Sequence, residues 1–217
     1  MKVTYGAIVQ RASGRFGGTV HSNWKGVDVV RRFAKPSDPN SSAQQIVRTL
    51  FRNLTRMYAT MPARTKAAWT TWATGKPLIA RNKLIGLNVP ALSPNSDWGD
   101  LYPVPGDSSA LPATVFVPTG GAGQITTAIT APDPPSGWTL SGAIACCVNA
   151  TFDPTTGTAS AADAQIYETE DVASPYAPTI SDLPADNYYT WAFLRWLAPD
   201  GSTRYSAALD GGSVVVA

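Results

Sequence analysis

Apolar residues recur with the period of an α-helix over residues 42–60. They follow one another at spacings of three and four from Ile46 to Tyr58, which places them on one side of a helix. The Asn-Ser-Ser run at 40–42 contains favoured N-cap residues, and Gln45 stands three positions after the last of them, as in a capping box. The pattern predicts a helix from about residue 42 to residue 60.

Shorter patterns flank this helix. A second helix is predicted from Pro62, a favoured first-turn residue, to Gly75, a residue type favoured just beyond a helix end. Trp69 and Trp72 are three apart on it, a spacing that favours a core position for both. Upstream, GTVHSNWKG and VDVVRRF predict two strands joined near Lys25 and Gly26. A hairpin of strands therefore leads into a hairpin of helices.

The chain from 77 to 112 has six prolines and little periodicity. It is expected to be an extended, Pro-rich arm or linker. Residues 113–217 instead contain seven strand-like segments separated by turn residues: ATVFVPT, GQITTAIT, WTLSGAIACCVNATF, AQIYETED, NYYTWAFLRWLA, TRYSAAL and GSVVVA. Seven short strands in this length predict an all-β sandwich of immunoglobulin-like type.

Charge divides the chain unevenly. Residues 1–90 carry 15 Lys and Arg against two acids, a balance of +13, whereas 91–217 carry two bases against 13 acids, a balance of −11. Such a split favours modules with different partners. We therefore expect a basic anchoring module at 1–76, the arm at 77–112 and an acidic sandwich at 113–217.

Little in the sequence favours catalysis. The residue that acts as an acid or base near neutral pH is usually histidine, and this chain has only one, His21. Cys146 and Cys147 are adjacent, so on a strand they point to opposite faces and are expected to be reduced and half-buried. Glu168, Glu170 and Asp171 are expected at a solvated strand end, with weak calcium binding as the alternative. We expect no enzyme, no cofactor, no metal site, no secretory signal and no membrane span.

The basic residues instead suggest docking. Arg48, Arg52 and Arg56 recur every four residues along the first predicted helix. The full docking set is Trp24, Lys25, Arg31, Arg32, Lys35, Arg48, Arg52 and Arg56. An acidic protein surface is one partner for it. Nucleic acid is an alternative, with arginines on phosphates and tryptophans stacked on bases. A solvated arginine stripe is the plainer interpretation.

Two resemblances follow from these motifs. The N-terminal third of the chain resembles small structural proteins of tailed bacteriophages and prophages. The motifs that carry this resemblance are, in order, Ser13-Gly14-Arg15-Phe16-Gly17, SNWKG, KPSDPN and Ala43-Gln44-Gln45. The run ISDLPADNYYTWAFLRWLAPDG resembles fibronectin type III domains, in which a tyrosine makes a corner hydrogen bond, here Tyr188 or Tyr189.

The phage resemblance implies a non-enzymatic virion protein assembled in the bacterial cytoplasm. A capsid decoration or cement protein is expected, with the major capsid or tail protein and copies of itself as partners. The alternatives are a tail, baseplate or connector protein and a nucleic-acid-binding protein. A third is a carbohydrate-binding sandwich that uses Trp138, Trp191 or Trp196, although the alternation of Tyr189, Trp191 and Phe193 on one strand favours a core role.

Overall fold

The computed structural model describes residue 2 and residues 12–24, 27–35, 40–95, 97–151, 153–155 and 165–217. The chain forms two compact units, Met1–Asn40 and Ser41–Ala217. The division after Asn40 differs from the expected boundary after residue 76, because the helices belong to the same unit as the sandwich.

The first unit is a small antiparallel sheet. It contains β1 (Gly14–Phe16), β2 (Thr19–Trp24) and β3 (Val27–Arg32) in the order β1-β2-β3. The predicted pairing of the last two strands is confirmed, with Thr19 opposite Arg32 and Trp24 opposite Val27. The predicted connection at residues 25–26 lies outside the described residues.

The second unit begins with the two predicted helices, α1 (Ser42–Thr60) and α2 (Ala63–Ala73). The N-cap of α1 is Ser41, whose Oγ accepts the Gln44 N–H at 3.4 Å, so the cap lies one residue before the predicted one. Gly75 follows α2 with a φ of 72°, in the left-handed region where glycine ends helices.

A third helix, α3 (Ala80–Asn95), takes up 16 residues of the extended arm that the sequence predicts at 77–112. It contains Pro90 and Pro94, which cannot donate the helical hydrogen bond. Gly86, Pro90 and Pro94 are all exposed and four residues apart, so they share one side of the helix. Water can therefore reach the carbonyl groups that the prolines leave without a donor.

The opposite side of α3 is buried. Leu84, Ile85 and Leu92 contribute to the core, and the fully buried Asn88 ties the helix to the chain that follows it. Asn88 Oδ1 accepts the Tyr102 N–H at 2.7 Å, and its Nδ2 donates to the Tyr102 carbonyl at 3.2 Å. The short 3-10 helix η1 (Trp98–Asp100) lies between these two residues in the chain.

The sandwich contains every predicted strand and one further short strand. Its strands are β4 (Val115–Gly121), β5 (Gln124–Thr130), β6 (Thr139–Asn149), β7 (Ile166–Asp171), β8 (Thr179–Ile180), β9 (Asp186–Leu197), β10 (Thr203–Tyr205) and β11 (Leu209–Val216). The larger sheet has the order β10-β9-β6-β7, with β11 also paired to β9, and the smaller sheet has the order β4-β5-β8. All these pairings are antiparallel.

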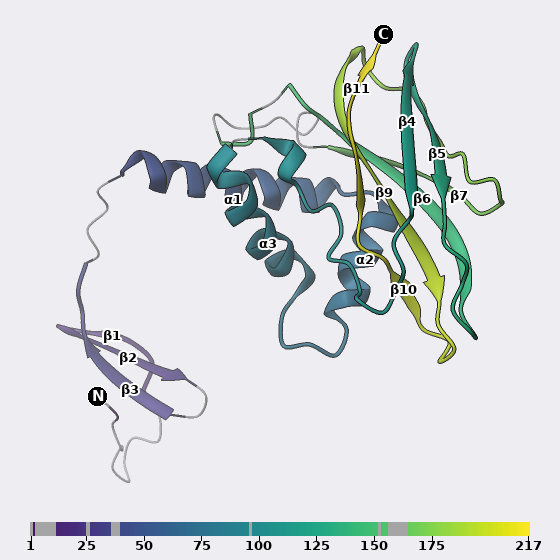
Figure 1. The fold of residues 1–217 in the computed structure, drawn as a ribbon. Helices are drawn as coiled ribbons and strands as arrows, with labels where there is room; N and C mark the ends of the chain where they lie inside the picture. The colour runs from purple at the N-terminus through teal and green to yellow at the C-terminus, as the bar shows by residue number, and fades with distance from the viewer. Residues whose placement is uncertain are drawn as a thin grey trace. The chain divides into compact units, whose positions relative to one another are not determined.

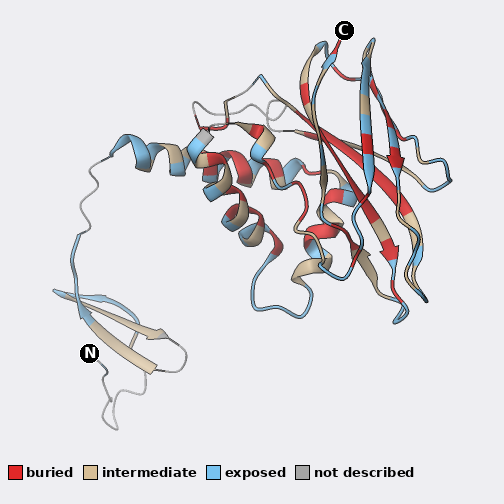
Figure 2. Cartoon of the chain, in the orientation of Figure 1, coloured by how far each residue is buried: buried red, intermediate tan, exposed pale blue. Residues whose placement is uncertain are grey.

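The second unit has three layers, in which the larger sheet lies between the helices and the smaller sheet (Figure 1). Along β6, Ile144, Cys146 and Val148 pack with the helices, whereas Ala143 and Ala145 pack with the smaller sheet. Both faces of β6 and β9 are therefore buried (Figure 2). The helices cover one face of the sandwich and do not form the separate module that was predicted.

Covering both faces changes the environment of several predicted residues. Cys146 and Cys147 are free and lie on opposite faces as predicted, but both are fully buried. Burial raises the pKa of the Cys147 thiol to about 12. Trp191 and Phe193 are buried, which confirms their core role. Tyr188 forms the predicted corner, since its hydroxyl donates to the Pro184 carbonyl at 3.0 Å.

Candidate docking surface

The three predicted arginines of the first helix lie on its exposed side. Arg48, Arg52 and Arg56 are all exposed, whereas Leu50 and Leu54 are fully buried on the opposite side of α1. The apolar stripe thus fixes the rotation of the helix against the core, and the four-residue spacing aligns the arginines on the outside. Figure 2 shows exposed positions in the first turns of α1 and buried positions further along the helix.

Two apolar side chains lie among these arginines. Val47 is 45% exposed and Phe51 is 55% exposed, although both belong to the predicted apolar pattern. We call Val47, Arg48, Phe51, Arg52 and Arg56 the α1 face. Guanidinium groups bind carboxylates in a bidentate manner, and an aromatic side chain among them can act as an anchor in an interface. This chemistry matches an acidic protein surface.

Charge is separated between the layers of the second unit. Residues 41–96, which contain the three helices, carry eight Lys and Arg and no Asp or Glu. Residues 97–217, which contain both sheets, carry two bases and 13 acids. Because the helices cover only one side of the sandwich, the eight bases of residues 41–96 are gathered on one side of the same unit, where the acids Glu168 and Glu170 also reach them.

Two of the acids join these layers, which the sequence did not predict. The side chains of Glu168 and Glu170 on β7 are only 4% and 7% exposed, so the predicted solvated strand end is wrong. Glu168 accepts the backbone N–H groups of Arg64 and Thr65 at 2.8 and 2.7 Å, at the first turn of α2. Glu170 pairs with Arg64 at 2.7 Å and with Arg195 at 2.8 Å.

Glu168 thereby caps α2. The residue before this helix is Pro62, which has no side-chain group to accept a hydrogen bond, so a carboxylate from another element takes that role. A carboxylate is also favoured beside the positive end of the helix dipole. No local pattern in the sequence could have shown this contact, since the partners are 103 and 104 residues apart.

The remaining predicted docking residues belong to the first unit. Arg31, Arg32 and Lys35 are exposed there. Lys25 and the side chain of Trp24 lie outside the described residues. The structure therefore brings Arg48, Arg52 and Arg56 together on one helix and places the other predicted residues in another unit. Their union in a single docking surface stays a prediction.

In the described ranges, no cluster of three or more His, Cys, Asp or Glu side chains is arranged to hold a metal ion. His21 lies on β2, where its Nε2 is 3.3 Å from the Thr19 hydroxyl. None of the helices in the described part of the chain has the length and apolar character needed to cross a membrane.

Comparison with known proteins gives a partial likeness to solved structures. No protein-family model and no curated protein sequence matches this chain. A solved structure described as fibronectin(III)-like modules of CbhA from Clostridium thermocellum aligns with 19% identity and a TM-score of 0.26. The alignment covers 48% of this chain and 43% of that chain.

Proposed function

We propose that this chain is a non-enzymatic structural component of a tailed-phage particle, acting as a capsid decoration or cement protein. The observation that carries the proposal is the acid-free helical layer with an exposed arginine row, opposite an acid-rich sandwich. The α1 face would dock on a repeated acidic surface of the particle, and the sandwich would be displayed on the outside. The resemblance of the first 75 residues to phage structural proteins supports the same role.

The sandwich is assigned in this proposal to the immunoglobulin-like class. Its two antiparallel sheets and the corner hydrogen bond of Tyr188 support the assignment. Trp191 and Trp196 are buried in the two cores that join the helices and the sheets, so they are not on the surface that the sandwich would display. These two residues are therefore poor candidates for the carbohydrate-binding alternative.

An acidic protein surface is favoured over duplex DNA as the partner of the α1 face. Phosphates would pair with the arginines but would leave Val47 and Phe51 without an apolar partner. The 13 acids of the sandwich side would also be repelled by a long polyanion that approaches the unit. A protein surface can supply both carboxylates and apolar contacts within one interface.

Copies of this chain have a second surface available for mutual contact. The outer face of the smaller sheet is exposed and carries no charged side chain on β4 or β5; its members are Val115, Val117, Thr119, Gln124, Thr126, Ala128 and Thr130. Copies with a common net charge repel least where neither carries charge. We propose that neighbouring copies meet on this outer β4–β5 face.

The first experiment measures the copy number of the chain in purified particles by quantitative mass spectrometry. Hundreds of copies per particle would support a capsid or tail-surface lattice. A dozen or fewer would contradict the decoration role and favour a connector or baseplate position. Particles that lack the chain would overturn the virion proposal altogether.

The second experiment tests the α1 face by binding of the purified chain to particles that lack it. Arg48→Glu/Arg52→Glu should lower binding at least tenfold, because charge pairs become charge clashes. Lys66→Glu/Arg81→Glu is the matched control, since it changes net charge equally outside the α1 face. An equal loss in both variants would contradict a local docking surface.

Duplex DNA is tested in parallel over a range of salt concentrations. The nucleic-acid alternative predicts tight duplex binding whose logarithm falls steeply with the logarithm of salt concentration. Weak, shallow binding to DNA alongside tight binding to particles would support the proposal made here. Tight, strongly salt-dependent binding to DNA alongside weak binding to particles would favour nucleic acid as the partner instead.

A further inference from the structure

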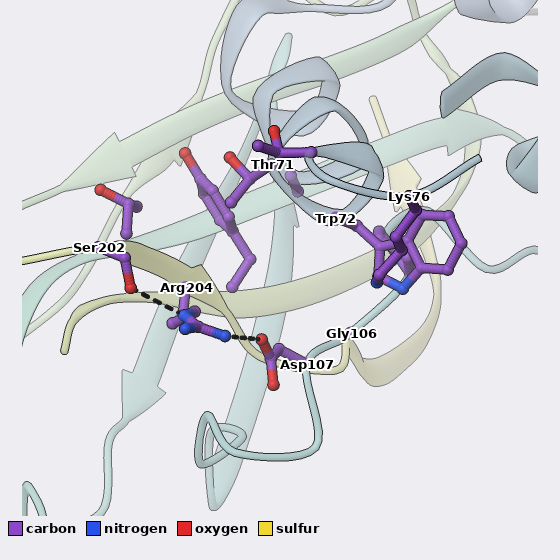
Figure 3. Close-up of a pocket in the computed structure, with 12 residues that line it drawn as sticks. Thr71, Trp72, Lys76, Gly106, Asp107, Ser202 and Arg204 are labelled. Carbon is purple, nitrogen blue, oxygen red and sulfur yellow. Dashed lines mark hydrogen bonds and ion pairs between the residues drawn. The ribbon is translucent and has the colours of Figure 1, made fainter. Parts of the chain in front are cut away.

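A pocket of about 370 Å³ lies between the end of α2, the loop at residues 105–107 and strand β10 (Figure 3). Its position places it in the second unit, away from the α1 face. Trp72 lines it together with Lys76 on the helical side, and Asp107 and Arg204 line it on the other side. The volume lies near the lower end of the range of about 300–1,000 Å³ that small-molecule sites occupy.

Trp72 borders this pocket and is less buried than its sequence pattern predicts. The helical spacing predicted a core position for Trp69 and Trp72, and Trp69 is fully buried, but Trp72 remains partly exposed at the pocket. A large amphipathic ring that borders a cavity offers a surface for the apolar face of a ligand. The departure from the expected burial therefore marks a feature that the core does not explain.

Two ammonium groups share this indole ring. Lys76 Nζ lies 3.7 Å and Lys83 Nζ lies 4.9 Å from the ring centroid. Within the described residues neither lysine forms an ion pair with a carboxylate. The aromatic ring attracts each cation, but the two cations repel each other. Lys76 also lines the pocket, so an anion bound there would offset part of that positive charge.

The opposite wall carries a neutralised cation. Arg204 Nη1 lies 3.0 Å from Asp107 Oδ2, its Nη2 lies 3.3 Å from Asp200 Oδ2, and its Nε donates to the Ser202 hydroxyl at 2.9 Å. These contacts fix a set of donors and acceptors at the cavity wall. The hydroxyl groups of Thr71 and Thr203 also belong to residues that line the pocket. Such a wall suits a ligand rich in hydroxyl groups.

The pocket is held by rigid contacts. Asp107 N–H donates to the Tyr205 carbonyl at 2.8 Å, and Trp69 Nε1 donates to the Pro103 carbonyl at 2.8 Å, so the loop is tied to both β10 and α2. Gly106 has a φ of 63°, and a Cβ there would approach the Ala207 backbone to 3.0 Å. The loop thus keeps one conformation, which limits the ordering cost of binding.

We propose that this pocket binds one acidic sugar unit, a hexuronate or another carboxylated sugar. Lys76, which lines the pocket, would hold the carboxylate, and Lys83 would add positive charge beside the Trp72 ring. The Trp72 ring would border the sugar ring, and Asp107, Arg204 and the hydroxyl side chains would bind its hydroxyl groups. A single negative charge fits better than a phosphate dianion, because Asp107 places a carboxylate on the pocket wall. The proposal is independent of the particle role and goes beyond it.

Sodium glucuronate is the probe, and glucose, acetate and inorganic phosphate are the matched controls. Binding to the full chain is measured by chemical-shift titration of the Trp72 indole N–H and by calorimetry at low salt. Glucuronate is expected to bind with a Kd of about 1 mM, corresponding to about 4 kcal/mol. Glucose and acetate are expected to bind at least tenfold more weakly, since each supplies only part of the recognised chemistry.

Lysine variants distinguish binding in the pocket from a general effect of positive charge. Lys76→Gln/Lys83→Gln should weaken glucuronate binding at least tenfold. Lys66→Gln, on α2 with its Nζ 5.1 Å from the Tyr58 ring and outside the pocket lining, should change it less than twofold. Equal binding of phosphate and glucuronate would show a general anion site and overturn the sugar assignment. Absence of glucuronate binding at 20 mM would overturn the site, without bearing on the copy number in particles.

Discussion

Glu168 offers the sharpest test of how the helices and the sandwich form one unit. In Glu168→Ala the acceptor for two backbone N–H groups at the start of α2 is lost, together with the acceptor of the Thr65 hydroxyl at 2.6 Å. Thr65 is fully buried, so water cannot replace its lost partner without opening the interface. Arg64 is 44% exposed, and its N–H can be rehydrated at lower cost.

The structure sets the magnitude. Each buried donor left unsatisfied costs about 1–3 kcal/mol, and Thr65 supplies two of them. Together with the lost contact to the helix terminus, the expected loss of unfolding free energy is about 3–5 kcal/mol, similar to breaking a buried ion pair. Glu168→Gln retains one acceptor oxygen and should cost about 1–3 kcal/mol. Arg64→Met keeps both N–H bonds and should cost less than about 1 kcal/mol.

The assay is urea unfolding followed both by circular dichroism at the helix band and by tryptophan fluorescence. The two signals should change together in the wild type and in all three variants, because one core contains residues of the helices and of β6, β7 and β9. Heating should show a decrease in Tm of about 6–12 °C for a loss of 3 kcal/mol. A cost below 1 kcal/mol for Glu168→Ala, or a helix signal that disappears first, would refute the reasoning.

Three further predictions follow from contacts within the second unit. Leu54→Ala removes a fully buried side chain of α1 and should lower the unfolding free energy, measured by urea titration, by about 2–5 kcal/mol. Its control is Phe51→Ala, at an exposed position of the same helix, which should change the unfolding free energy by less than about 1 kcal/mol. Asn88→Ala leaves the Tyr102 N–H without its 2.7 Å acceptor and should cost about 1–3 kcal/mol; hydrogen exchange of that N–H should accelerate, and unchanged exchange would contradict the clamp. Burial raises the pKa of Tyr188 from its ordinary value of 10.0 to about 12. The stability that this neutral phenol contributes is full below about pH 10 and is lost as the pH rises towards 12. The urea midpoint of Tyr188→Phe should therefore fall less steeply at alkaline pH than that of the wild type.

Local patterns were sufficient for most individual elements. The helix at about 42–60 is predicted with its bounds close to those observed, because its apolar spacing and polar N-terminal residues agree. The strand segments were found from β-branched runs between turn residues, and the corner tyrosine from its Leu-Pro context. These features depend on neighbours within a few positions, so a single sequence contains the information that determines them.

The arm at 77–112 was predicted wrongly because proline was given too much weight. Pro90 and Pro94 lie on the exposed side of α3, where the missing hydrogen bonds cost less than they would in a core. The buried side of α3 is specified by Leu84, Asn88 and Leu92 at four-residue spacing. That pattern was present in the sequence and becomes decisive once the helix packs on α1.

Contacts between distant segments could not be predicted. The acids of β7 resemble an exposed strand end in isolation, because nothing near them in the sequence indicates that α2 will cover them. The adjacent cysteines of β6 are expected from the sequence to be half-buried, yet both faces of this strand are covered. Burial of a strand on two sides is a property of its neighbours in space, and its sequence alone does not identify them.

The position of the helices also changes the meaning of the charge split. In the sequence the balance of +13 and −11 suggested two modules joined by an arm, each with its own partner. In the structure the bases of the helices and the acids of the sheets belong to one unit, whose own balance is ten bases against 13 acids. A unit with opposite charges on two sides is oriented by an external field before contact, although its net charge is small. An acidic particle surface would therefore turn the helices toward itself and the sandwich away, so that the arrangement of charge within the unit, rather than a flexible arm, would determine which side is displayed.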